Sequence, residues 1–253
     1  MNYCHYPEGK FWMDGYMWSG LEAVEDNYMR GEDNDWVAIV TGMEDNQAVR
    51  VGKSTLACQM AKKLDPSFPY DCSRVCFDST EFMQQLQGAT RRQAIVFDEA
   101  YKDLGTDFAL THKLKRLKSI FMEMGQKNLY LIIVMPSFRS VPEWLAKDRS
   151  NVLFTCYINR TTGRKGYWGL YDKHSKSEYW DYIRRLTKGR KRPYYLRNGM
   201  FANTLPIDPV KYAEKKQIAL TELLKSSIAK DKNKTNNDLL AEFIRTIQDS
   251  NQK

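Results

Sequence analysis

The tetrapeptide Gly52-Lys53-Ser54-Thr55 has the residue types and order needed to bind a phosphate chain. An apolar run over residues 36–41 precedes it, and apolar residues at helical spacing follow it. This order predicts a buried strand, a loop and a helix whose first turn carries the tetrapeptide. Backbone N–H groups at a helix N-terminus bind phosphate, Lys53 would reach its outer oxygens, and the Ser54 hydroxyl would ligate Mg²⁺.

Two adjacent carboxylates follow a second apolar run over residues 94–97, which predicts another buried strand. Asp98 would hold the same Mg²⁺ ion, and Glu99 would polarise the attacking water as a general base. Together the two segments predict a site that binds and hydrolyses ATP with Mg²⁺. The sequence has no guanine-reading Asn-Lys-x-Asp motif, and no other motif distinguishes ATP from GTP.

The phosphate loop departs from the usual G-x-x-x-x-G-K-[ST] spacing. The residue five places before Gly52 is Gln47, and the nearest upstream glycine is Gly42. Either Gly42 begins a loop with five extra residues within 43–51, or the loop is degenerate. Two further interpretations stay open: a chance GKST in a surface turn, and a folded but inactive relic of an ATPase.

The remaining patterns predict an α/β fold. Apolar runs alternate with helical patterns, which is typical of a mainly parallel sheet with helices on both faces. A turn at residues 161–164 predicts that the last strand returns as an antiparallel edge hairpin. The expected strands are 36–41, 74–77, 94–98, 129–135, 152–158 and 167–171, and the expected helices include 20–30, 80–86, 108–124 with Gly125 as its C-cap, 210–224 and 239–247.

Length and composition predict one ATPase domain with two extensions. We expect an N-terminal arm at 1–35, the ATPase domain at 36–182, and a basic segment with C-terminal helices at 183–253. The net charge of +8 favours a polyanionic partner. The five cysteines are scattered, which suggests reduced thiols inside a cell, so we expect a protein of the cytoplasm, or of the host cytoplasm if it is viral. No run of 18 apolar residues occurs, so we expect no association with a membrane.

Within residues 36–172 the chain resembles the additional-strand, catalytic-glutamate branch of P-loop NTPases. It is most similar there to the FtsK/HerA-like DNA-pumping ATPases and the zonular occludens toxin-like proteins of phages. The segments that carry the resemblance are GKST at 52–55, FDEA at 97–100, residues 134–137 and Arg149-Ser150-Asn151. The resemblance implies a RecA-like P-loop core that acts as a ring-shaped homo-oligomer.

The resemblance also implies residues that sense the γ-phosphate or complete a neighbour's site. An arginine before the last core strand can neutralise charge on the transferred phosphoryl group of the next subunit, which makes Arg149 the first choice and Arg139 the second. Ser137 follows the strand over 129–135, where a polar sensor residue would lie. A surface arginine and a hydroxyl in a turn are the competing interpretations.

A basic segment between residues 184 and 197 predicts a nucleic-acid contact. It has seven basic residues, no acidic one and two adjacent tyrosines, and such residues neutralise phosphates and stack on bases. A solvated linker is the competing interpretation, as is a solvated face for the basic side of the helix at 108–124. The candidate contact residues are Arg184, Arg185, Lys188, Arg190, Lys191, Arg192, Tyr194, Tyr195 and Arg197.

Three functions agree with these patterns. The first is an ATP-hydrolysing motor that translocates or packages DNA, with double-stranded DNA as its expected partner. The second is a helicase-loader-like or other remodelling ATPase that needs a partner protein. The amphipathic segment 239–247 would dock on this protein, on a second copy or on a partner protein. The third is a structural or regulatory module that binds nucleotide without hydrolysing it.

Overall fold

The computed structural model describes residues 3–6, 10–28, 34–44, 50–105, 112–185, 191–223 and 225. The chain divides into two compact units, Met1–Pro209 and Val210–Lys253. The domain boundaries expected after residues 35 and 182 stay predictions.

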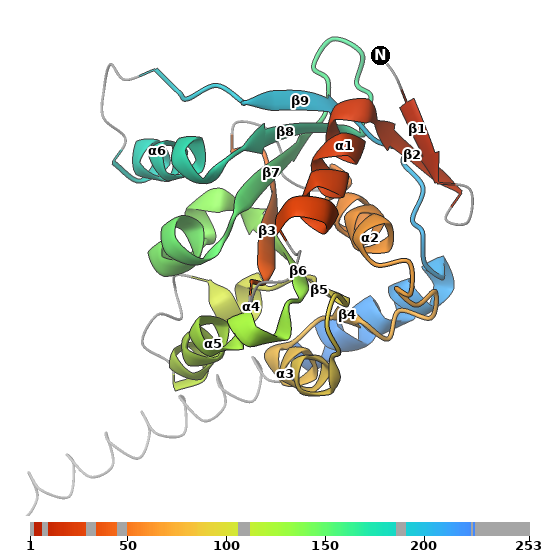
Figure 1. The fold of residues 1–253 in the computed structure, drawn as a ribbon, viewed down its shortest axis with the longest axis vertical. Coiled ribbons are helices and arrows are strands. Elements are labelled where there is room, and N and C mark those ends of the chain that lie inside the picture. Colours follow the sequence, from red (N-terminus) through yellow and green to blue (C-terminus); the bar gives the residue numbers. More distant parts are fainter. Residues whose placement is uncertain are drawn as a thin grey trace, which may run out of the picture. The chain divides into compact units, whose positions relative to one another are not determined.

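A seven-stranded sheet with the order β4-β5-β6-β3-β7-β8-β9 forms the centre of the first unit (Figure 1). The first five strands in this order (β4, β5, β6, β3 and β7) are parallel to one another, and β8 and β9 are antiparallel to their neighbours. The predicted α/β class with an antiparallel edge is therefore confirmed. The strands are β3 (Trp36–Gly42), β4 (Val75–Cys76), β5 (Ala94–Phe97), β6 (Tyr130–Ser137), β7 (Val152–Tyr157), β8 (Tyr167–Tyr171) and β9 (Arg197–Met200).

The position of β6 matters for the site. It pairs with β3 on one side and with β5 on the other, so one additional strand separates the strand before GKST from the strand before Asp98. Every residue of β3 is buried, as expected for a parallel strand covered on both faces.

Helices cover both faces of this sheet (Figure 1). α1 and α2 lie on one face, whereas the other face carries a cluster of buried side chains from α3, α5, η5 and α6. The bounds are α1 (Gly15–Ala23), η1 (Val24–Tyr28), α2 (Lys53–Leu64), α3 (Ser79–Gly88), α4 (Tyr101–Leu104), α5 (His112–Glu123), η3 (Met124–Lys127), η4 (Phe138–Ser140), η5 (Trp144–Arg149) and α6 (Lys173–Arg185).

An N-terminal hairpin of β1 (Tyr3–Tyr6) and β2 (Phe11–Asp14) is joined to the far edge of the large sheet by Asp14. One carboxylate oxygen of this buried residue caps α1 by accepting from Tyr16 N and Met17 N. The other accepts from the Trp168 indole at 2.6 Å and from Met200 N at 3.1 Å. The expected arm thus packs on the first unit.

The structure corrects several element predictions. Gly125 is not a C-cap, because the chain continues as the 3₁₀ helix η3 and ends at Asn128, whose φ of 50° is left-handed. The first helix begins at Gly15 rather than Gly20, since Asp14 caps it there. Helix α6, strand β9 and the N-terminal hairpin were not predicted.

In the second unit, the described residues from Val210 to 223 are helical, and apolar side chains such as Ile218 and Leu220 are exposed. The predicted helix at 239–247 lies outside the described residues. Among the described helices, none has the length and apolar character required to cross a bilayer.

Candidate nucleotide site

The GKST tetrapeptide forms the start of α2, as predicted. Gly52 is the N-cap with a left-handed φ of 95°, and its carbonyl accepts the Leu56 N–H at 2.9 Å. Lys53, Ser54 and Thr55 are half-buried in the first turn. Their N–H groups therefore belong to a helix N-terminus, where the helix dipole favours an anion. Residues 45–49 of the loop lie outside the described part of the chain.

The N-terminal end of the long loop is attached to β7 and to η4. Gly42 is the last residue of β3, and the next N–H, that of Met43, donates to the Cys156 carbonyl at 3.1 Å. The Glu44 carboxylate accepts the backbone N–H of Arg139 at 3.0 Å. Glu44 was not predicted as a site residue, and the one feature of the sequence that could have indicated it is its acidic side chain shortly after the strand.

Lys53 lies close enough to the end of β7 to act on the Cys156 thiol. Burial raises the pKa of Cys156 to about 12, and the positive charge of Lys53 acts in the opposite direction. Cys156 is the register partner of Gly42, so this end of β7 borders the phosphate loop.

Asp98 is buried beside α2. Burial raises the pKa of the Cys58 thiol, and the negative charge of Asp98 raises it further. Cys58 is one helical turn after Ser54, so the two residues share one side of α2. The charge of Asp98 therefore acts on the side of α2 that carries Ser54, and both residues supply oxygen ligands of the kind that Mg²⁺ prefers.

Glu99 has a strained backbone. Its φ is 54°, a left-handed conformation that few residues other than glycine adopt. Its N–H donates to the Asp98 carboxylate at 2.9 Å, and the next N–H, that of Ala100, donates to Val134 O of β6. Strain of this kind is concentrated at functional sites, where the surrounding structure holds it in place.

Ser137 is the last residue of β6 and Arg139 lies in η4 directly after it, so both are at the end of the sheet that holds the phosphate loop. Ser137 is half-buried and is the register partner of Gly42. The Arg139 side chain is exposed, and one of its guanidinium nitrogens donates to the Ile183 carbonyl at 2.9 Å.

Arg149 lies at the opposite end of the parallel strands, where β3 and β7 begin. It precedes β7, its guanidinium forms an ion pair with the buried carboxylate of Asp35 just before β3, and it also donates to the Phe121 carbonyl. Because β3 and β7 are parallel and this ion pair lies where both strands begin, the length of β3 separates it from Gly42. The structure therefore does not bring Arg149 to Lys53 of the same chain.

The residues of the basic segment have different surroundings. Arg192 lies over the rings of Tyr179 and Tyr195 and donates to the hydroxyl of Tyr179 at 3.2 Å, so Arg192 and Tyr195 pack within the chain. Arg184 is exposed but lies over the Trp180 ring. Lys191, Tyr194 and Arg197 are exposed, whereas the side chain of Arg185 and all of Lys188 and Arg190 lie outside the described residues.

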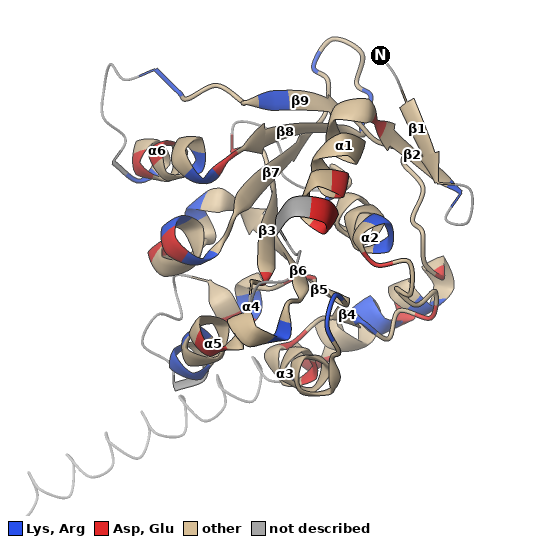
Figure 2. Cartoon of the chain, viewed as in Figure 1, with Lys and Arg blue, Asp and Glu red and all other residues tan. Residues whose placement is uncertain are grey.

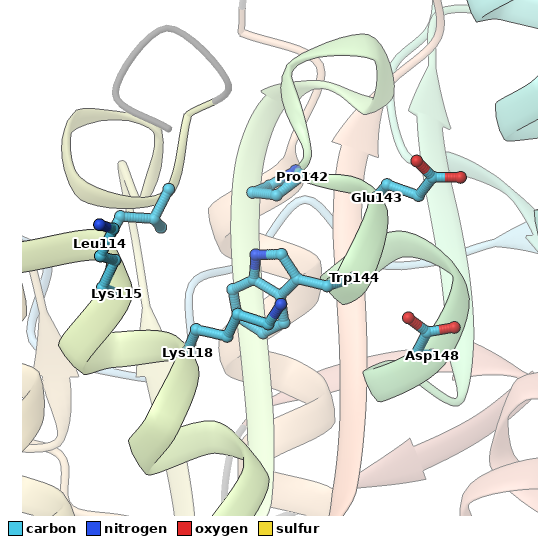
Figure 3. A pocket seen from close by; sticks show the side chains of 7 residues that line it. All are labelled: Leu114, Lys115, Lys118, Pro142, Glu143, Trp144 and Asp148. Atoms are coloured by element: carbon cyan, nitrogen blue, oxygen red, sulfur yellow. The ribbon is translucent and has the colours of Figure 1, made fainter. Parts of the chain in front are cut away.

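A separate groove of about 610 Å³ lies between α5 and η5 (Figure 3). Lys115 and Lys118 line the α5 side, and Glu143 and Asp148 line the η5 side. The two positive and two negative charges of the groove therefore balance, so the groove lacks the excess of positive charge that would favour a polyanion.

No protein-family model matches the chain, and no curated protein matches it. Solved structures that are similar to it include the genome packaging NTPase B204 from Sulfolobus turreted icosahedral virus 2 in complex with ATP-gammaS and the same protein in complex with AMPPCP. Each is 13% identical and the match covers 57% of this chain and 95% of the other, with TM-scores of 0.37 and 0.38. The fold assignment rests on the sheet order and strand register of the chain itself.

Proposed function

We propose that the chain is a P-loop ATPase that couples hydrolysis to the movement or packaging of DNA. The observation that carries the enzymatic part is the shared edge of the sheet. The first turn of α2 and the Asp98-Glu99 pair both lie there, with only β6 between their strands. The charge of Asp98 acts on the side of α2 that also holds Ser54.

Each residue has a distinct role in the proposed reaction. The N–H groups of the first turn of α2 and the Lys53 ammonium bind the phosphate chain. Ser54 and Asp98 hold Mg²⁺, which when bound neutralises charge on the phosphates. Glu99 orients the attacking water and accepts its proton, and Ser137 lies at the end of β6 to sense the γ-phosphate.

The motor part of the proposal is supported by charge and by Arg139. The net charge of +8 favours a polyanion, and duplex DNA is the proposed partner. The motor that we propose is a ring in which one subunit supplies a cation to its neighbour's site. Arg139 is exposed at the edge that holds the phosphate loop, whereas Arg149 is bound to Asp35 at the other edge. Arg139 is therefore the better candidate for the trans-acting arginine.

The test is ATP hydrolysis by the purified chain with and without double-stranded DNA, in wild type and in Glu99→Gln. We expect DNA to stimulate hydrolysis, and we expect the variant to bind ATP but to lose about 10²–10⁴-fold in rate, the usual contribution of a general base. Glu123→Gln, at an exposed position on α5, is the control and should hydrolyse normally. Full activity in Glu99→Gln would refute the assigned base.

The same measurement, repeated with a candidate partner protein present, separates the other two functions. Hydrolysis that requires a partner protein would identify a loader-like ATPase. ATP binding without turnover under every condition would identify a non-hydrolysing module with a degenerate phosphate loop.

A further inference from the structure

The tip of the β7–β8 hairpin carries a basic cluster that lies outside the segment considered so far. Residues 160–165 are all exposed and include Arg160, Arg164 and Lys165. No acidic residue occurs between Tyr157 and Tyr171. In Figure 2 the loop that rises at the top of the view carries blue segments and no red one. This cluster is called the hairpin tip below.

The hairpin tip leaves the sheet at the edge that holds the nucleotide site. β7 is parallel to β3, and Cys156 near its end is the register partner of Gly42. A molecule that contacts the tip is therefore held on the phosphate-loop side of the sheet.

The hairpin tip is held in one conformation by its own hydrogen bonds. The Asn159 side chain accepts from Thr161 N at 2.9 Å and Thr162 N at 3.0 Å. The Asn159 carbonyl accepts from Gly163 N, and the Asn159 N–H donates to Arg164 O. A preformed loop loses little conformational freedom when it binds a ligand.

Phe201 joins the base of this hairpin to the phosphate loop. Its N–H donates to the Gly166 carbonyl at 2.8 Å, and it is 2% exposed. On its other side, its ring lies against Gly52, where a Cβ atom would be only 3.0 Å from Phe201 Cζ. Gly52 is the N-cap of the phosphate-binding helix, so a shift at Gly166 reaches that helix through one side chain.

The segment after Phe201 is itself attached to α2. The Gln59 side chain, fully buried on α2, donates to Ala202 O and to Thr204 O at 2.7 Å each. Ala202 N donates to Trp12 O of the N-terminal hairpin. Phe201 is therefore held on both sides, by Gly166 through its own N–H and by the attachment of the next residue to α2 and to the N-terminal hairpin.

The chemistry of the hairpin tip fits a nucleic-acid backbone better than a protein surface. Residues 159–166 contain no apolar side chain that would serve as the buried anchor of a protein interface. Phosphate contacts need only cations, hydroxyls and backbone N–H groups, which the tip supplies.

We propose that the hairpin tip binds the phosphate backbone of the nucleic acid and that Phe201 transmits this contact to the phosphate loop as a positioning residue. The inference rests on the proposed function for its ligand. It adds a contact site outside residues 184–197 and a route from that contact to the nucleotide.

The first experiment tests the contact. Affinity for a fluorescent DNA duplex is measured over a range of salt concentrations for wild type and Arg164→Gln/Lys165→Gln. Loss of two phosphate contacts should lower the slope of log K against log salt by about 2. Arg91→Gln/Lys173→Gln removes the same charge at other exposed positions and should leave the slope unchanged. An unaltered slope in the tip variant, or equal losses in both variants, would overturn the contact and leave an acidic protein as the partner to examine.

The second experiment tests the transmission without relying on hydrolysis. The affinity for a non-hydrolysable ATP analogue is measured with and without saturating duplex DNA, because coupled sites change each other's affinity reciprocally. We expect DNA to change this affinity several-fold in wild type, much less in Phe201→Ala, and by an intermediate amount in Phe201→Leu. The salt slope of DNA binding should stay normal in both variants, and thermal unfolding checks their fold.

Full coupling in Phe201→Ala, or no coupling in wild type, would overturn the transmission. Failure of the proposed function has a different signature. In that case the tip variant still changes the salt slope and Phe201 still affects coupling, but wild type shows no turnover with or without DNA.

Discussion

At the scale of single residues, Glu99 combines a backbone that disfavours its residue type with a side chain that the proposed chemistry needs. A left-handed φ at a residue with a long side chain costs on the order of 1 kcal/mol or more relative to glycine. Asp98 and β6 hold this conformation through hydrogen bonds on both sides of it.

We therefore predict that Glu99→Gly is more stable than wild type but inactive. The free energy of unfolding in urea should rise by about 1 kcal/mol, because glycine adopts φ of 54° without strain. Glu99→Gln keeps the strain, so it should lose activity with no gain in stability. A destabilised Glu99→Gly protein would show that the side chain contributes packing that outweighs the strain.

Lys176 gives a second residue-scale prediction. It is completely buried on α6, its ammonium donates to the Ser150 hydroxyl at 2.6 Å, and burial together with nearby Lys173 lowers its pKa to about 7. Asp148 and Asp172 act in the opposite direction. In the unfolded chain the pKa returns to its ordinary value of about 10.4, so between pH 7 and 10 the unfolded state binds more protons.

The contribution of Lys176 should therefore make the protein more stable as the pH rises from 7 to 10. Relative to Lys176→Met, wild type should gain about 2–4 kcal/mol in free energy of unfolding over this range, at about 1.4 kcal/mol per unit of pKa difference. Urea unfolding at several pH values measures it. Lys115→Met, at an exposed position, is the control and should show no such trend. A constant difference between wild type and Lys176→Met would show that Lys176 stays charged.

At the scale of elements, buried strands were predictable and partner-dependent elements were not. The runs that became β3, β5, β6 and β7 are nearly all apolar, because a parallel strand covered on both faces has no polar side. By contrast, the sequence Arg-Asn-Gly-Met of β9 has no strand pattern of its own. It forms because Asp14 and β8 supply its hydrogen-bond partners.

The same distinction applies to the site. Lys53, Ser54, Asp98 and Glu99 were predicted because each directly follows or begins an element with a clear local pattern. Glu44 and Phe201 were not, since their partners Arg139 and Gly52 are far away in the sequence. No local pattern records such contacts.

Asp14 gives a prediction at this scale. Asp14→Asn should lower the free energy of unfolding by about 2–4 kcal/mol, because an amide NH₂ cannot accept the bonds from Trp168 and Met200. Asp78→Asn is the matched control: Asp78 caps α3 through one oxygen, and asparagine is an equally good N-cap. The control should be nearly neutral in urea unfolding. Equal losses in the two variants would show that Asp14 matters only as a helix cap.

At the scale of the whole molecule, a shared site between subunits is open to a mixing experiment. Arg139→Ala and Lys53→Ala should each be inactive alone, and mixtures should regain part of the activity, because some interfaces combine an intact arginine with an intact phosphate loop. Hydrolysis measured across mixing ratios tests this. If no ratio restores turnover, Arg139 does not act in trans.

Arg149 requires a different variant in the same experiment. Arg149→Ala leaves the buried Asp35 carboxylate without its ion pair, which typically costs about 3–5 kcal/mol, so loss of activity would follow from loss of stability. Arg149→Lys keeps the charge. If Arg149 acts in trans, Arg149→Lys should be inactive alone and should regain activity when mixed with Lys53→Ala; no rescue at any mixing ratio would exclude it.

The attachment of Phe201 and Met200 to the N-terminal half of the chain has a consequence for synthesis on the ribosome. Asp14 is made early, yet its partner Met200 lies 186 residues later. A nascent chain can therefore form β3, β5 and β6 before β9, the strand to which Asp14 of the N-terminal hairpin binds, has been synthesised. The Gly52 contact arrives with Phe201, almost at the end of the first unit. A chain that is truncated before residue 200 would contain every residue of the nucleotide motif and would still lack the side chain that packs against its loop.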